Sequence, residues 1–146
     1  MTIEPTVVFT RLTVISEYLR ELKRFESMSL EEYLEQFDQK IISERLLELI
    51  IQAALDINEH ILKQGFKVEV STNKESFLKS GECGILTLQL AGELAQSGGL
   101  RNILAHQYLN IDHTLLFGHV QKALKQYPLY IQQVTTYLDS LEVNNG

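Results

Sequence analysis

The stretch from Arg101 to Tyr108 carries the side chains of this chain that are best suited to chemistry. It reads R-N-x-x-x-H-x-Y and gathers a permanent cation, a carboxamide, an imidazole and a phenol within eight residues. The planar guanidinium of Arg101 presents N–H donors that match phosphate oxygens. An imidazole titrates close to neutral pH, so His106 is able to accept or donate a proton. These properties predict a site that binds a phosphate and moves protons at a ribose hydroxyl.

Cleavage of a phosphodiester bond in RNA needs this set of groups. The 2′-hydroxyl must lose a proton, the charge of the phosphorane must be neutralised, and the 5′-oxygen must regain a proton. His106 and Arg101 supply two of these three functions without a metal, and a general acid or base of this kind contributes about 10²–10⁴ in rate. Two copies of the site would supply all three.

The spacing of Arg101 and His106 raises a geometric question. Residues five apart on an ideal helix differ by about 140° in direction, so the two side chains of one straight helix diverge. They converge where the helix bends, or where each meets its counterpart across a two-fold axis. His106 and Tyr108, two residues apart, also point to different sides of a continuing helix, and the turn before Asp112 would bring those two together. The spacing alone leaves these possibilities open.

Each motif residue taken singly also has a structural explanation. An arginine after a glycine pair caps a helix or lies on the surface, and a lone histidine or tyrosine in a helix is usually structural. Asn102 is able to bond the local backbone. The joint spacing of the four residues favours the functional interpretation.

The motif resembles R-x4-H-x-Y of the HEPN-domain ribonucleases, in particular the HepT-like toxins of minimal-nucleotidyltransferase/HEPN toxin–antitoxin pairs. The sequence from Gly99 to Tyr108, followed by Ile111 and Asp112, is similar to that family's motif region. The helix that contains residues 43–57 is similar as well. The resemblance extends over roughly residues 5–140.

The resemblance implies an all-α, up-and-down helical bundle that forms a homodimer or higher oligomer, with both motifs facing one cleft. It implies metal-independent endoribonuclease activity on tRNA or mRNA, with Arg101 and His106 as catalytic residues and Asn102 orienting the site or binding RNA. Neither a metal nor another cofactor is expected.

The resemblance also implies a partner, a small nucleotidyltransferase antitoxin. In this family the antitoxin transfers AMP from ATP to the motif tyrosine, which makes Tyr108 the candidate modification site. An adenylylated Tyr108 would add bulk and negative charge and would repel RNA.

Length and composition predict one globular unit, and the resemblance implies that it is a single HEPN-like helical domain over residues 1–146. Apolar residues make up 45% and charged residues 22% of the chain. The single Cys83 excludes an intrachain disulfide and, with four scattered histidines, gives no zinc spacing. The N-terminus has no signal-peptide pattern, and no apolar run approaches the roughly 18 residues of a membrane span. We therefore expect a soluble, cytoplasmic protein with no membrane partner.

The charge distribution is asymmetric. The net charge of −6 argues against a non-specific nucleic-acid binder. Between Glu93 and Asp139, however, Asp112 is the only acid. The same stretch holds Arg101, Lys122, Lys125, His106, His113 and His119. This asymmetry is explained either by a solvated helix face or by a local anion site on an acidic body.

Apolar periodicity predicts about five to six helices. The predicted ranges are 6–24, a short helix after Ser29, 39–64, 74–79, 85–95 and 113–141. Ser29, Thr72 and Asp112 are predicted N-caps, and Gly65 is the predicted end of the central helix. The central helix carries two apolar stripes, which predicts burial against the bundle and against a second subunit.

Two shorter segments complete the predicted organisation. Gly98 and Gly99 would each cost about 1 kcal/mol inside a helix, so a break is expected directly before the motif. Residues 66–70 alternate as a strand would, but the chain offers no pairing partner, so we expect a loop.

Two other functions compete with the ribonuclease. The chain could be a non-catalytic HEPN partner in which Arg101 binds a nucleotide for a nucleotidyltransferase. Alternatively, the motif could be a packing device of a purely structural helical dimer. In the first case nucleotide binds without RNA cleavage, and in the second Arg101→Ala and His106→Ala lower stability instead of activity.

Overall fold

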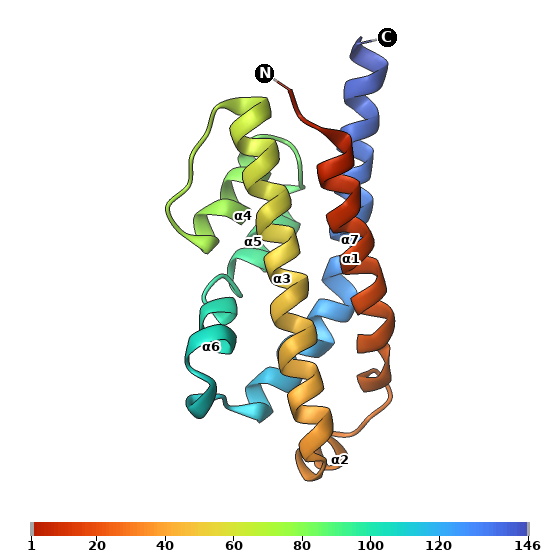
Figure 1. Cartoon of the computed structure of the whole chain (residues 1–146), viewed down its shortest axis with the longest axis vertical. Coiled ribbons are helices and arrows are strands. Elements are labelled where there is room, and N and C mark those ends of the chain that lie inside the picture. Colours follow the sequence, from red (N-terminus) through yellow and green to blue (C-terminus); the bar gives the residue numbers. More distant parts are fainter. Residues whose placement is uncertain (1, 146) are drawn as a thin grey trace.

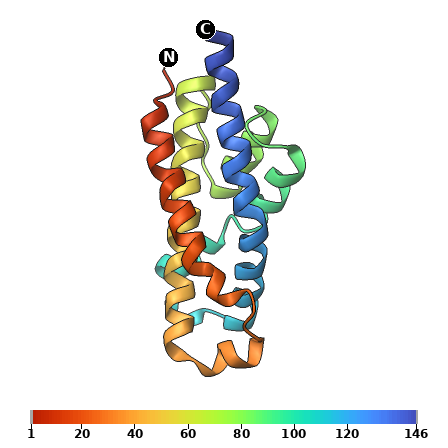
Figure 2. The same cartoon turned by 90° about the vertical axis from the view of Figure 1, so that its right-hand side faces the viewer.

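Three long helices form the body of the protein, which a computed structural model describes over residues 2–145. These helices are α1 (Pro5–Leu22), α3 (Phe37–Phe66) and α7 (His113–Asn145). They run side by side along the long axis, and α1 packs against both of the others (Figures 1 and 2). The described residues contain no strand, which confirms the predicted all-α bundle.

Four shorter α-helices and two 3-10 turns complete the chain. They are α2 (Leu30–Glu35), α4 (Asn73–Glu82), α5 (Leu88–Ala95), α6 (Leu100–His106), η1 (Lys23–Phe25) and η2 (Tyr108–Asn110). Helices α4 and α5 pack on each other, while α6 packs on α3 in the half of the molecule away from the termini (Figure 1). Six of the seven α-helices in residues 2–145 correspond to predicted ranges, and α6, of seven residues, was not predicted as a separate helix.

The predicted N-caps are confirmed. Ser29 Oγ accepts the backbone N–H three residues on at 3.1 Å, and Thr72 Oγ1 does the same at 3.1 Å. The Asp112 carboxylate accepts from the amides of Thr114 and Leu115 at 3.0 and 3.2 Å. Each cap satisfies donors that the first turn of a helix leaves free.

The end of α3 differs from the prediction. The helix passes Gly65 and continues to Phe66, and the left-handed residue is Lys67, with φ 55°. A Cβ on Gly65 would lie 2.8 Å from the Ile3 side chain, so this glycine makes room for the N-terminal segment instead of ending the helix. The following residues form no strand, as predicted.

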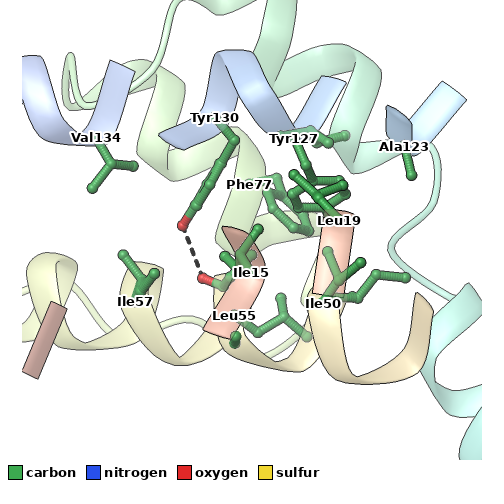
Figure 3. Packing of buried hydrophobic residues seen from close by; sticks show 14 of the residues in the cluster. Ile15, Leu19, Ile50, Leu55, Ile57, Phe77, Ala123, Tyr127, Tyr130 and Val134 are labelled. Carbon is green, nitrogen blue, oxygen red and sulfur yellow. Dashed lines mark hydrogen bonds between the residues drawn. The ribbon is translucent and has the colours of Figure 1, made fainter. Parts of the chain in front are cut away.

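Both apolar stripes of α3 are buried within one chain. The first stripe includes Ile50 and Ile57, which are fully buried against α1 and α7 (Figure 3). The second includes Leu47, Ile51 and Leu62, which are at most 1% exposed, on a helix that α4 and α6 also contact. The chain's own short helices cover the second stripe, so burial of α3 on two sides is confirmed within one chain, and contact of α3 with a second subunit stays a prediction.

Candidate functional site

Helix α6 carries most of the motif and lies against α3. Leu104 is buried and Leu100 packs against the core, so the apolar side of α6 faces the bundle. The chain reaches α6 through the predicted break at Gly98 and Gly99, between α5 and α6. A Cβ on Gly98 would lie 2.8 Å from the backbone nitrogen of Lys74, so only glycine lets this turn approach the start of α4 so closely.

Arg101 is half-buried and incompletely paired. Its Nε is buried and has no hydrogen-bond partner among the described residues. Its Nη1 lies 3.4 Å from Asn102 Oδ1, which is at the long limit of a hydrogen bond. Buried donors almost always have partners, so an orphaned guanidinium nitrogen indicates capacity for an acceptor such as a phosphate oxygen.

Asn102 and His106 both face solvent. Asn102 lines a hollow of about 310 Å³ together with Gly98, Gly99 and residues 71–74. His106 is the last residue of α6 and is exposed. Both polar side chains are thus accessible to a ligand on the surface of the molecule.

The structure does not bring Arg101 and His106 together within one chain. Helix α6 is uninterrupted from Leu100 to His106, so the two residues differ by about 140° around it. Among the described residues, neither a hydrogen bond nor an ion pair joins them. The expectation that a bend within the motif helix brings the two side chains together is therefore wrong, because the break at Gly98 and Gly99 lies before Arg101. Convergence across a two-fold axis stays a prediction.

Tyr108 begins the 3-10 turn η2, directly after α6 ends. Its side chain lies outside the described residues, so its orientation also stays a prediction. The neighbouring Leu109 is 85% exposed. Local backbone bonds hold this turn, from the Gln107 amide to the Ile103 carbonyl at 2.9 Å and from the Asn110 amide to the Gln107 carbonyl at 2.9 Å.

A pair that the sequence analysis missed lies just beyond this turn. His113 is the first residue of α7, and its Nε2 lies 2.6 Å from Glu44 Oε2 on α3. The two residues are 69 positions apart, so no local pattern signals their contact. The pair ties the end of the motif region to the central helix.

A second polar cluster lies behind the start of α6. A small cavity of about 20 Å³ is lined by Leu100, His119, Lys122 and Tyr127, among others. Burial lowers the pKa of His119, and the charge of Lys122 lowers it further. Lys122 and Lys125 are exposed on α7, so part of the basic stretch reaches the surface near α6.

The described residues contain neither a cluster of metal ligands nor a membrane-spanning helix. Three or more His, Cys, Asp or Glu side chains do not gather anywhere among them as metal ligands would. None of the described helices combines the length and the apolar character that crossing a membrane requires.

Comparison with known proteins decides the family. Residues 15–134 match the family described as Ribonuclease HepT-like. The chain is 49% identical over 143 residues to the tRNA nuclease HepT of Aphanizomenon flos-aquae (strain 2012/KM1/D3), covering 98% of this chain and 97% of that protein. The chain belongs to the HepT-like ribonuclease family.

Solved structures share the fold of this HepT-like chain. A crystal structure of a toxin–antitoxin with AMP-PNP aligns with a TM-score of 0.79 and 18% identity, covering 90% of this chain and 98% of that one. A tri-AMPylated Shewanella oneidensis HEPN toxin in complex with MNT antitoxin aligns with a TM-score of 0.78 and 19% identity, covering 89% and 97%. The HepT-like bundle is thus the HEPN fold.

Proposed function

We propose that this protein is the toxin of a toxin–antitoxin pair and a metal-independent endoribonuclease that acts on tRNA. The observation that carries the proposal is the half-buried Arg101, whose unpartnered Nε lies in the same short helix as the exposed His106. Among RNA substrates, tRNA is favoured because the relative that is 49% identical is named a tRNA nuclease.

In this proposal Arg101 binds the scissile phosphate and neutralises the charge of the phosphorane. His106 of one subunit takes the proton of the 2′-hydroxyl, whose oxygen attacks phosphorus and forms the P–O2′ bond. The P–O5′ bond breaks, and His106 of the second subunit protonates the leaving oxygen. The products are a 2′,3′-cyclic phosphate and a 5′-hydroxyl. Asn102 orients the bound RNA.

The second subunit is part of this proposal because one chain holds Arg101 and His106 apart. Apolar side chains next to the motif support such an interface. Ile103, Leu109 and Leu115 are 37, 85 and 64% exposed, which is costly for large aliphatic side chains that remain in water. A two-fold contact near these residues would bury them and bring two motifs to one site.

The proposed partner is a nucleotidyltransferase antitoxin that adenylylates Tyr108. Support comes from a solved structural neighbour, an AMPylated HEPN toxin in complex with its MNT antitoxin. Tyr108 follows His106 by two residues, so an AMP group there would place negative charge beside the site and repel RNA. The tRNA and ATP that this chemistry uses support a cytoplasmic location, and the match of residues 15–134 to one family supports a single domain.

Cleavage of tRNA by the purified protein in the presence of EDTA tests the nuclease. We expect cleavage by the wild type and a loss of about 10²–10⁴ in rate for His106→Ala. The matched control is His60→Ala, because His60 Nε2 accepts from the Glu4 amide far along α3 and should not affect cleavage. A strict need for added metal would contradict the mechanism. Nucleotide binding without cleavage would favour the non-catalytic alternative instead.

Intact mass measured after incubation with the antitoxin and ATP tests the modification. We expect the mass of one or more AMP groups on the wild type and none on Tyr108→Phe. Tyr18→Phe is the control, since Tyr18 lies on α1 and is packed against the core. AMP on Tyr108→Phe would show that another residue is the acceptor.

A further inference from the structure

We infer that Glu44 and His113 are positioning residues, whose contact sets the place of segment 107–112 relative to α6. This inference rests on the proposed function, because that segment carries Tyr108 and follows His106. The Nε2–Oε2 distance of 2.6 Å joins the second turn of α3 to the first residue of α7. Neither residue belongs to the motif.

The segment has few anchors of its own. Apart from Tyr108, whose side chain is not described, its residues are exposed except for Ile111, which is half-buried against the core. The backbone bonds donated by Gln107 and Asn110 reach only three or four residues back along the chain. The segment therefore depends on what holds its two ends. Leu104 anchors α6 on one side, and His113 anchors the other.

The His113 end is held inside a packed corner of the bundle. The side chains of His113 and Glu44 are 24 and 17% exposed, so salt screens their interaction less than that of a surface pair. The Tyr33 ring lies 6.3 Å from the His113 ring and 5.0 Å from that of Phe117. The Tyr33 hydroxyl lies 2.7 Å from Ser43 Oγ, which connects this corner to α3.

The chemistry of the pair determines the direction of the imidazole. An ionised carboxylate only accepts hydrogen bonds, so His113 Nε2 must carry the hydrogen that it donates to Glu44. A ring held through one nitrogen against a rigid helix, with an aromatic ring beside it, has one favoured orientation. The first turn of α7 is therefore placed by the pair and by the Asp112 cap together.

Loss of the contact between Glu44 and His113 should therefore lower the rate of RNA cleavage without weakening the binding of RNA. Arg101 lies on α6, which Leu100 and Leu104 anchor to the core, so binding of the RNA phosphate should not change. His106 is the last residue of α6 and adjoins the segment, so it would lose the fixed position that the following turn gives it. A displacement of about 1 Å at a catalytic group costs about 10²-fold in rate.

The variants are Glu44→Ala, His113→Ala, the double variant and Glu44→Gln, compared as full-length protein with tRNA as substrate. The control is Asp56→Ala. Asp56 forms another pair between helices, with Arg11 at 3.6 Å, and lies about 18 Å farther along α3. Cleavage gives kcat and KM, and hydrogen exchange gives the protection of residues 107–112.

We expect each single alanine variant to lower kcat by about tenfold or more, with KM changed by less than about twofold. The double variant should be no worse than the more affected single variant, because both remove the same contact. Exchange should rise in residues 107–112 and not in α1. Glu44→Gln should recover most of the rate, since its amide oxygen still accepts from His113, and Asp56→Ala should cleave as the wild type does.

Unchanged exchange in residues 107–112 of Glu44→Ala would overturn the inference. The inference would also be overturned if the loss of kcat in the double variant equalled the product of the two single losses. A loss of kcat in Asp56→Ala as large as that in Glu44→Ala would overturn it as well. If the wild type fails to cleave any RNA, the proposed function fails, and the exchange experiment alone then decides whether the pair positions the segment.

Discussion

The interior of the bundle and the motif segment, residues 100–112, differ in whether their polar groups are paired and their apolar groups buried within the chain. In the interior, Tyr130 is fully buried between the helices (Figure 3). Its hydroxyl lies 3.0 Å from the Ala54 carbonyl and 2.7 Å from Asn58 Oδ1. In the segment, Leu109 is 85% exposed and the buried Nε of Arg101 has no partner among the described side chains. The interior thus pairs the hydroxyl of Tyr130 within the chain, while the segment leaves the guanidinium of Arg101 and the side chain of Leu109 to be satisfied by something else.

This difference shows how the chain separates stability from chemistry. Three long helices with fully buried side chains hold the fold, so the short α6 and η2 need not contribute much to it. A group that will meet a ligand must stay unpaired or exposed until the ligand arrives, and this costs stability. The surrounding scaffold offsets that cost, which is common at functional sites.

The first prediction is a loss of tRNA cleavage without a loss of stability. Arg101→Ala should lower tRNA cleavage by about 10²–10³, the range found when one donor that stabilises a transition-state charge is removed. Its free energy of unfolding should change by less than about 0.5 kcal/mol, because the lost Nε has no partner in the fold. The measurements are cleavage rate and urea unfolding. Arg24→Ala, which removes a surface pair with Glu21, should alter neither.

The next effect is on stability alone. Ile57→Ala should lower the free energy of unfolding by about 2–5 kcal/mol, because the fully buried side chain leaves a cavity between helices. Cleavage per folded molecule should remain at the wild-type rate. Leu88→Ala, at a side chain that is 72% exposed, is the control and should change stability by less than about 0.5 kcal/mol. A large loss of activity per folded Ile57→Ala molecule would break the separation of the two regions.

Inside the bundle, the neighbouring buried tyrosines Tyr127 and Tyr130 allow a paired and an unpaired hydroxyl to be compared. Tyr130→Phe should cost about 1–3 kcal/mol, because it leaves the buried Asn58 oxygen without its donor. Tyr127→Phe should be neutral or stabilising, since the Tyr127 hydroxyl is buried and has no partner among the described residues. Thermal and urea unfolding of the two variants measure the difference. Equal losses would show that the Tyr127 hydroxyl is paired in solution.

The two glycines at the joint between the regions should differ as well. Gly98→Ala brings a Cβ within 2.9 Å of two backbone atoms of Lys74, so we expect a loss of about 1–3 kcal/mol and slower cleavage as α6 shifts. Gly99→Ala meets no atom within 4 Å and has an ordinary φ of −83°, so we expect a gain of up to about 1 kcal/mol. Unfolding curves of the pair test this. A neutral Gly98→Ala would show that α4 and this turn separate easily.

Much of the fold could be predicted because its signals are local. The stripe of Val8, Leu12, Ile15 and Leu19 repeats at the helical period, and all four side chains are buried on α1. The N-caps at Ser29, Thr72 and Asp112 bond amides within three residues, so a short window of sequence contains both partners. The end of α3 was harder, because Ile3 decides the packing at Gly65 from the other end of the chain.

The residue types of the candidate site could be predicted from the sequence, but their positions in space only partly. The residue types and spacing of the motif identified Arg101 and His106, but not that α6 would hold them on different sides of one straight helix. Glu44 gave no signal at all, because its contact with His113 spans 69 residues. Contacts of this kind arise only when distant segments are packed side by side.

The amino-acid sequence by itself determined which long segments are helical, where the helices with side-chain caps begin, and which short stretch holds groups able to bind phosphate and move protons. These properties depend on the period of apolar residues and on partners within one or two turns. Only the tertiary structure decided that α3 is covered on both sides by its own chain, that the Arg101 Nε is left without a partner, and that Glu44 meets His113. Burial and long-range pairing are properties of packed surfaces, and packed surfaces exist only after the helices have come together.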